Sequence, residues 1–289
     1  MRDHYSPSPS VVVGIDGSRS AVNAALWAVD EAISRDIPLR LIYAIDPADT
    51  TSTDPEDAAR DLAKADVAVR HAFTAVESTD KPVKIEVEIL QKRPTQALLE
   101  ASRWAAMVCV GSMGLKHSAH GRIGSTTAAL ASSARCPVAI IGGHDPLQAK
   151  QQWVVAELDE SRASEGVLRR AFEEAHLRGV SLRVVNAWQS RFTDVHDSDA
   201  VADGNRLGTA QLDRRLAQWK KRYPDLDVSA VTVHDSTLNF LVKNARSIQL
   251  LIVGRERAHG ITVLVGPPGY AALHNAECSV LICEPQNIL

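Results

Sequence analysis

A glycine-rich segment in the first half of the chain has the composition of an anion-binding loop. Gly111 and Gly114 follow an apolar run, and Gly124 and Ser125 come after nine further residues, where an alanine-rich helical pattern begins. Glycine lets the backbone approach a ligand without an intervening Cβ, and its N–H groups can point at an anion. A helix start adds unpaired N–H groups and the positive end of the helix dipole. The sequence therefore predicts a phosphate-binding loop between a strand and a helix.

An aspartate at the end of the first apolar run could act on the same ligand. Asp16 is followed by Gly17 and Ser18, which begin a helical pattern. In open α/β sheets, ligands bind beyond the carboxyl ends of the strands, where the strand order reverses. With the order 3-2-1-4-5, the strand ends at Asp16 and Gly111 are neighbours, and a nucleoside with a phosphate tail fits between them. The alternative role of Asp16 is local, as a turn residue or helix N-cap, and the two roles are compatible.

Alternating strands and helices position these residues. Continuous apolar runs predict strands, and apolar residues at helical spacing predict helices. The expected strands span 11–16, 39–45, 83–90, 106–111 and 137–141, and the expected helices span 18–34, 55–78, 94–104 and 124–134. Strands joined by helices imply an α/β fold with an open five-stranded parallel sheet, order 3-2-1-4-5, covered by helices on both faces.

The second half of the chain repeats the first at a nearly constant spacing. Residues that recur 143 positions later are Val12, Asp16, Ser18, Arg35, Leu39, Arg40, Ala44, Leu98, Val110 and Gly111. After the glycine loop the spacing falls to 142, so the second loop has lost one residue. A repeat of this length indicates two copies of one domain rather than a solenoid. We expect a flexible N-terminus at 1–10 and domains at 11–145 and 151–289.

Composition and charge favour a two-domain cytoplasmic protein. The 289 residues are 45% hydrophobic and 23% charged, which is enough for two cores. A formal charge of -3, with no basic and aromatic run, argues against a nucleic-acid partner. The first apolar stretch breaks at Gly14, too short for a secretory segment or membrane span. The four cysteines lie in apolar surroundings without CxxC spacing, so we expect core thiols.

These residues together resemble the universal stress protein family in its tandem, ATP-binding form. The family's pattern Gly-x2-Gly-x9-Gly-Ser is matched in full at Gly111, Gly114, Gly124 and Ser125. Its strand-end aspartate is matched at Asp16, and the similarity covers essentially residues 11 to 285. The resemblance implies a five-stranded parallel α/β fold that holds an adenine nucleotide with Mg2+ in its crevice. It also implies dimerisation through the last strand, which the two copies could imitate within one chain; a homodimer is compatible as well.

The resemblance further implies a role for each residue of the site. Asp16 would contact the nucleoside, and the backbone of Ala44 would meet the adenine. The phosphates would be held by Gly111, Gly114, Gly124, Ser125 and Thr126. Lys116 and Arg122, inside the nine-residue insert, could neutralise phosphate charge. The sequence identifies no catalytic residue and no protein ligand to a metal.

The second copy departs from the pattern at its loop. Asp159 persists, but other positions change, namely Glu157 for Gly14, Arg257 or Glu256 for Gly114, and Pro267 for Ser125, with Pro268 following. Because proline has no N–H, the helix start loses donors that an anion would need. We therefore expect little or no ATP binding in the second crevice, and a packing or regulatory role for this copy. Trp188, at a strand end near that crevice, is the tryptophan with a chance of contacting a ligand.

Three classes of function fit the sequence. The preferred one is a nucleotide-dependent regulator of stress response or growth, acting on a protein partner that the sequence does not identify. The second is a slow ATP-hydrolysing or phosphoryl-transferring enzyme, although no general base is evident and no Walker lysine follows the glycines. The third is an interaction scaffold without nucleotide. A nucleotide that co-purifies with the protein would exclude the scaffold and leave the regulator and the enzyme.

Overall fold

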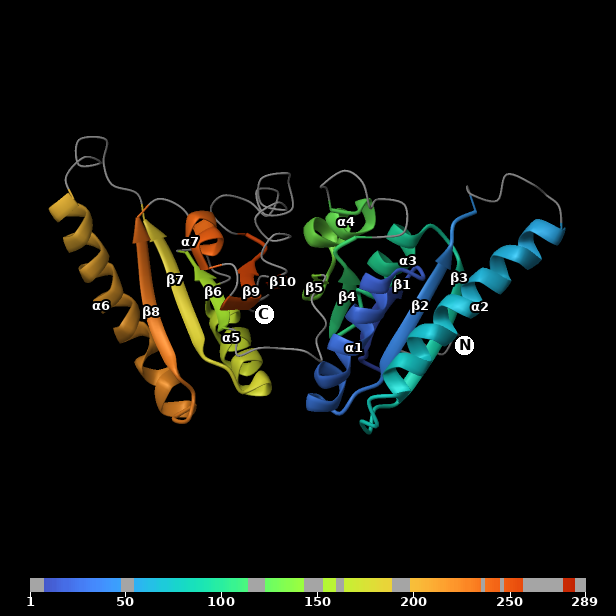
Figure 1. Cartoon of the computed structure of the whole chain (residues 1–289), viewed down its shortest axis with the longest axis horizontal. Coiled ribbons are helices and arrows are strands. Elements are labelled where there is room, and N and C mark those ends of the chain that lie inside the picture. The colour runs from blue at the N-terminus through green and yellow to red at the C-terminus, as the bar shows by residue number, and fades with distance from the viewer. Residues whose placement is uncertain are drawn as a thin grey trace, which may run out of the picture. The chain divides into compact units, whose positions relative to one another are not determined.

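The computed structural model describes residues 8–47, 55–113, 123–142, 153–159, 164–188, 198–234, 237–244, 247–256 and 278–283. The chain divides into two compact units, Met1–Gln148 and Ala149–Leu289. Figure 1 labels the helices and strands of both units.

Strands and helices alternate along the first unit. They are β1 (Val11–Ile15), α1 (Arg19–Ser34), β2 (Leu39–Ile45), α2 (Pro55–Glu77), β3 (Ile85–Gln91), α3 (Pro94–Ala101), β4 (Met107–Gly111), α4 (Ser125–Ser133) and β5 (Val138–Ile141). The strands lie in the order β3-β2-β1-β4-β5, and the neighbouring strands pair in parallel. The predicted fold class and strand order are therefore confirmed.

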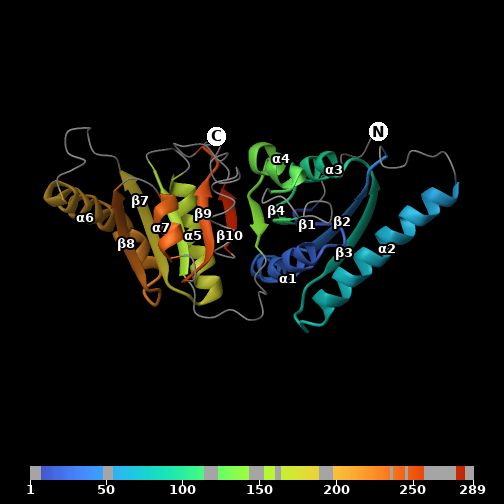
Figure 2. The same cartoon turned by 45° about the horizontal axis from the view of Figure 1, so that its top comes forward.

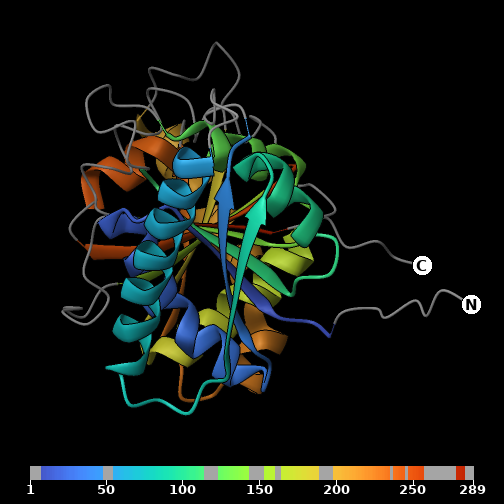
Figure 3. The same cartoon turned by 90° about the vertical axis from the view of Figure 1, so that its right-hand side faces the viewer.

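Helices cover both faces of this sheet. The helices α1 and α2 pack against each other, as do α3 and α4. Figure 3 shows the cyan α2 and the green α3 on opposite sides of β2 and β3. Val11, Val12 and Val13 of the central strand are completely buried, because this strand is covered on both faces. Over the described residues of the whole chain, no helix combines the length and apolarity needed to cross a bilayer.

The second unit repeats this architecture. Its described elements are β6 (Trp153–Leu158), α5 (Ser164–Arg178), β7 (Leu182–Trp188), α6 (Ser198–Arg222), β8 (Val228–His234), α7 (Thr237–Asn244), β9 (Ile248–Gly254) and β10 (Ser279–Cys283). The strands lie in the order β8-β7-β6-β9-β10 and pair in parallel. Counted from its own first strand, this order is again 3-2-1-4-5. The repeat in the sequence is thus a repeat of the fold.

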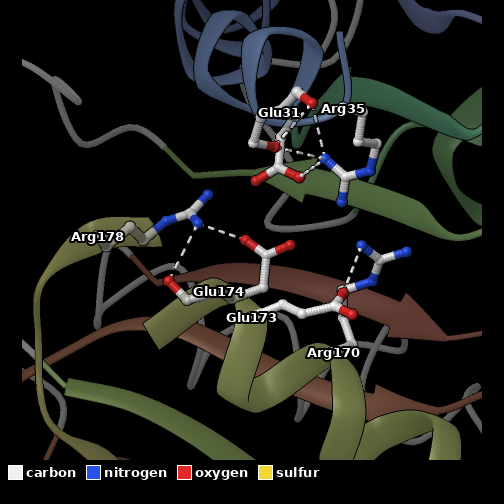
Figure 4. Close-up of polar contacts among 7 residues, drawn as sticks. Glu31, Arg35, Arg170, Glu173, Glu174 and Arg178 are labelled. Atoms are coloured by element: carbon white, nitrogen blue, oxygen red, sulfur yellow. Dashed lines mark hydrogen bonds and ion pairs between the residues drawn. The ribbon is translucent and has the colours of Figure 1, made fainter. Parts of the chain in front are cut away.

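The repeat extends to an ion pair on the first helix of each unit. At the end of α1, Nη1 of the C-cap residue Arg35 donates to the carboxylate and to the carbonyl oxygen of Glu31, both at 2.7 Å. In α5, Arg178 pairs with the Glu174 carboxylate in the same i,i+4 arrangement (Figure 4). The two glutamates are 0% and 1% exposed. A carboxylate buried this deeply needs a charged partner, and in each unit an arginine at the C-terminal end of the same helix supplies it.

The largest difference from the predicted element bounds occurs at α3. The helical pattern predicts a helix over 94–104, but α3 ends at Ala101. Ser102 is 1% exposed, and its hydroxyl donates to the carbonyl oxygen of Leu99 at 2.7 Å and accepts the Arg135 backbone N–H at 3.0 Å. This contact with the chain after α4 stops the helix early, and it leaves Arg103 and Trp104 in an exposed turn. A tertiary contact of this kind leaves no local signal in the sequence.

The cysteines are buried thiols, as their apolar surroundings predict. All four, namely Cys109, Cys136, Cys278 and Cys283, are buried and free. Burial raises the pKa of Cys278 and of Cys283 to about 12. These two thiols therefore stay protonated at neutral pH and are poor nucleophiles.

Candidate functional site

A cavity of about 1350 Å³ opens where the strands of the first unit end. It lies at the reversal of strand order, because β1 pairs with β2 on one side and with β4 on the other. The described residues of the predicted site all line it, namely Asp16, Ala44, Gly111, Gly124, Ser125 and Thr126. Gly114, Lys116 and Arg122 lie outside the described residues. The structure thus brings together residues from β1, β2, β4 and α4 that are far apart in the sequence.

Asp16 combines a local role with a place on the cavity wall. Its Oδ1 accepts the backbone N–H of Ser18 at 2.9 Å, across a turn in which Gly17 has a φ of 85°. That left-handed conformation favours glycine. Ser18 is the helix N-cap, since its hydroxyl accepts the N–H of Ala21 at 3.2 Å. Asp16 is therefore the turn residue, and Ser18 is the N-cap of α1.

The start of α4 has the features of an anion site. Gly124 is the N-cap residue, and no side chain caps this helix start among the described residues. Among the described residues, Thr127 Oγ1 is the one atom within 4 Å of a Cβ built on Gly124, at 3.7 Å, so these residues leave room beside its backbone. Uncapped N–H groups and the helix dipole both favour negative charge at this position. The cradle accordingly fits a phosphate group.

Gly111 has a second reason to be glycine, which is packing against α1. A Cβ at this position would lie 2.5 Å from Ser20 Oγ and 2.8 Å from the Ser20 backbone carbon. The Ser20 hydroxyl donates to the carbonyl oxygen of Met113, and the Thr127 hydroxyl donates to that of Gly111 at 3.2 Å. These contacts connect α1, β4 and α4 beneath the cavity. The close approach of α1 could not be predicted from the glycine spacing.

The far wall of the cavity comes from β2 and α2. Tyr43 and Asp46 line it beside Ala44, and α2 contributes Asp61 and Lys64. Lys64 Nζ lies 2.9 Å from Asp61 Oδ1. These α2 residues could not be predicted from the sequence, because an i,i+3 pair of charges is typical of an ordinary solvated helix face. Only the packing of α2 over the strand ends places them at the cavity.

The described part of the cavity wall contains acidic side chains but no cluster of metal ligands. Among the described residues, no group of three or more His, Cys, Asp or Glu side chains is placed to hold a metal. Mg2+ usually binds through one or two carboxylates together with substrate phosphates and waters. A Mg2+ ion that is bound mainly by ligand phosphates and waters would need no such cluster of side chains.

The corresponding strand end in the second unit has different chemistry. Glu157 occupies the position of Gly14, where in the first unit a Cβ would approach Leu98 Cδ1 to 2.8 Å. The Ser164 hydroxyl donates to the carbonyl oxygen of Asp159 at 2.6 Å, and lies 3.2 Å from its Oδ1. The second unit therefore has an added carboxylate and an aspartate already engaged by a buried hydroxyl. Arg257, Pro267 and Pro268 lie outside the described residues.

Trp188 is a packing residue of the second unit. Its indole Nε1 donates to Asn205 Oδ1 at 2.7 Å, and its ring meets His234 edge-on with centroids 5.0 Å apart. A Cβ on Gly204 of α6 would lie 2.3 Å from the same ring. The side chain thus fills the space between β7 and α6, which explains its presence without a ligand.

Known proteins share both the fold and the duplication. A sequence model of the Universal stress protein family matches residues 9–142 and 154–284. Universal stress protein Rv2028c of Mycobacterium tuberculosis strain H37Rv is 47% identical over 287 residues, covering 99% of each chain. Universal stress protein Rv3134c of the same strain is 46% identical over 285 residues, covering 98% of each. The crystal structure of a universal stress protein from Archaeoglobus fulgidus DSM 4304 matches with a TM-score of 0.69 over 98% of both chains, at 14% identity. The chain belongs to the universal stress protein family, with two tandem copies of the family's domain.

Proposed function

We propose that this protein is a cytoplasmic, nucleotide-dependent regulator that binds ATP with Mg2+ in the crevice of its first unit. The observation that carries the proposal is one cavity with the Asp16 carboxylate on one rim and the uncapped start of α4 on another. An acid suits the hydroxyl and amine donors of a nucleoside, whereas a helix start suits phosphates. The two ends of one nucleotide are therefore complementary in polarity to these two rims.

The rest of the cavity wall suits the parts of such a ligand. Apolar side chains, among them Ile42, Leu98 and Val110, line it beside Ala44 and offer contact to a purine ring. Arg93, at the start of α3, adds an exposed guanidinium to the lining. A cation there would offset part of the charge of a triphosphate.

Regulation would follow from what the nucleotide connects. A ligand that contacts Asp16, Ala44 and the start of α4 joins three separate elements of the sheet edge. A nucleotide can shift a conformational equilibrium only by the difference in its affinity for the two states. Bridging contacts of this kind supply such a difference, so occupancy would be sensed by a protein partner at this edge.

The test is to identify what the purified full chain carries and whether it turns over. Heat releases any bound nucleotide from the purified protein, and the released nucleotide is identified. In a second experiment, phosphate production from Mg-ATP is followed for hours. Bound ATP that survives intact supports the regulator. Steady multi-turnover phosphate release that is lost in an Asp16→Ala variant supports the enzyme instead. No bound nucleotide, together with calorimetry that is silent at millimolar Mg-ATP, leaves the scaffold.

A further inference from the structure

The cavity of the first unit is larger than a mononucleotide site needs to be. Its volume of about 1350 Å³ exceeds the roughly 300–1,000 Å³ of ordinary ligand pockets. Its lining continues past the start of α4, between α3 and α4, to the far ends of both helices. We call this part the α3–α4 arm and define it by Thr95, Thr126, Glu100, Arg103, Ser133 and Arg135.

The arm has a fixed frame, because its two helices are joined at both ends. α3 and α4 lie side by side in Figures 1 and 2 and pack against each other. At their starts, the hydroxyls of Thr95 and Thr126 lie 3.4 Å apart. At their far ends, the buried Ser102 hydroxyl accepts the Arg135 N–H at 3.0 Å. The arm therefore leads from the phosphate cradle to a defined place beside Arg103 and Arg135.

Two arginines with unused donors mark the end of the arm. Arg103 and Arg135 are exposed, and neither forms an ion pair with a carboxylate of the described residues. The acid of the arm is Glu100, which already binds Lys92 Nζ at 2.5 Å and Gln96 Nε2 at 2.9 Å. Those hydrogen bonds, more than the nearby Arg103, lower the pKa of Glu100. Both guanidiniums keep donors that can bind an anion in a bidentate manner.

The position of the arginines beyond two helix ends is favourable on its own, since cations complement the dipole there. The interaction with the helix dipole explains why arginine is tolerated at these positions, but it supplies no hydrogen-bond acceptor to the N–H donors of the side chains. Nor does it explain why a continuous cavity joins these residues to the phosphate cradle. Both features follow if an anion reaches the arginines from the cradle.

We propose that the α3–α4 arm binds phosphate groups beyond the third, so that the ligand class of this site is a nucleoside polyphosphate longer than a triphosphate. The inference rests on the proposed nucleotide site of the first unit. The geometry has the right scale, because α4 has nine residues and is about 13 Å long at 1.5 Å per residue. Arg103 and Arg135 line the same cavity beyond the far ends of α3 and α4, where an extended phosphate chain that leaves the start of α4 would approach them.

Calorimetry on the full chain with Mg2+ tests this inference with ATP, adenosine 5′-tetraphosphate and diadenosine tetraphosphate. Two charge-assisted contacts predict that both longer ligands bind at least about tenfold more tightly than ATP. The double variant Arg103→Ala/Arg135→Ala should lose that advantage and keep the affinity for ATP within about twofold. The matched control is Arg60→Ala/Arg70→Ala, which removes the same charge from exposed positions of α2 outside the cavity and should behave as wild type.

The outcomes separate this inference from the proposed function. If ATP binds but the longer ligands bind no more tightly, or if the double variant keeps their advantage, the arm proposal is wrong and the nucleotide site stands. An equal loss for all three ligands in the double variant, with native circular dichroism, would also overturn it. If no nucleotide binds the wild type, both proposals fail together. If diadenosine tetraphosphate binds more tightly than adenosine 5′-tetraphosphate, the arm also binds the second nucleoside.

Discussion

Two glycines of one loop pattern are glycine for different reasons. At Gly111 a Cβ would collide with the backbone of Ser20, which no side-chain rotation can relieve. At Gly124 the nearest described atom to a Cβ would be Thr127 Oγ1, at an ordinary contact distance of 3.7 Å. Packing therefore requires glycine at position 111, whereas the packing of the described residues does not require it at position 124. The spacing pattern alone marks both equally.

These two glycines predict opposite consequences of substitution. Gly111→Ala should lower the free energy of unfolding by about 1–3 kcal/mol, because α1 must move away from β4. Gly124→Asp should leave stability unchanged or raise it by up to about 1 kcal/mol, because aspartate is a good N-cap and its charge suits the dipole. The same carboxylate should weaken ATP binding by more than tenfold, since it occupies the phosphate cradle. Urea unfolding and calorimetry measure both quantities, and wild-type ATP affinity in Gly124→Asp would place the phosphates elsewhere.

The two roles of Asp16 can be separated with a pair of variants. Asp16→Asn keeps an acceptor for the Ser18 N–H but loses the charge, so it should be nearly as stable as wild type and bind ATP less tightly. Asp16→Ala loses the turn acceptor as well and should also be destabilised by about 1 kcal/mol. Unfolding and binding measured on the same samples distinguish the roles. An Asp16→Asn variant that binds ATP as wild type does would restrict Asp16 to the turn.

At the scale of elements, strands and helix starts were predictable and helix faces were not. The strand Leu39–Ile45 and the start of α2 at Pro55 fall at their predicted positions, because continuous apolar runs and N-terminal prolines are local signals. The early end of α3 and the placement of Lys64 depend on which element packs where. Such contacts join residues distant in sequence, and a single chain carries no pattern for them.

The joint between α3 and α4 gives a prediction at this scale. Ser102→Ala removes the acceptor of the Arg135 N–H from a buried position, so the free energy of unfolding should fall by about 1–2 kcal/mol. The control is Ser132→Ala, because Ser132 is exposed and bonds only within its own helix, to the Ala128 carbonyl oxygen. Its effect should stay within about 0.5 kcal/mol. Equal urea midpoints for the two variants would show that Ser102 does not join the helices.

At the scale of the whole molecule, duplication preserved the fold and changed the chemistry of the strand ends. The order 3-2-1-4-5 recurs in both units, and so does the helical Glu–Arg pair. Glu157 and Ser164, in contrast, replace Gly14 and Ala21, both of which line the cavity of the first unit. Fold could be predicted for both halves from the repeat. The candidate site could be predicted in outline for the first half alone, since its glycine loop is intact there.

This asymmetry predicts one tight nucleotide site per chain. Calorimetry should give a stoichiometry near one, because the second strand end presents an added carboxylate and an engaged aspartate to a polyanion. Asp16→Ala should remove most of the heat, whereas the matched substitution Asp159→Ala should leave it unchanged. Two equal tight sites, or loss of binding in Asp159→Ala, would contradict the assignment of the site to the first unit.

The central position of β1 has a consequence for synthesis on the ribosome. Val11 of β1 pairs with Met107 of β4, so β1 cannot complete its pairing until β4 has been synthesised. At 5–20 residues per second, that wait is on the order of 5–20 s. Once β5 has emerged, the first unit has all its strands while the second is still being translated. We therefore expect the nascent chain to encounter cellular ATP with its first crevice already assembled and its second half unmade.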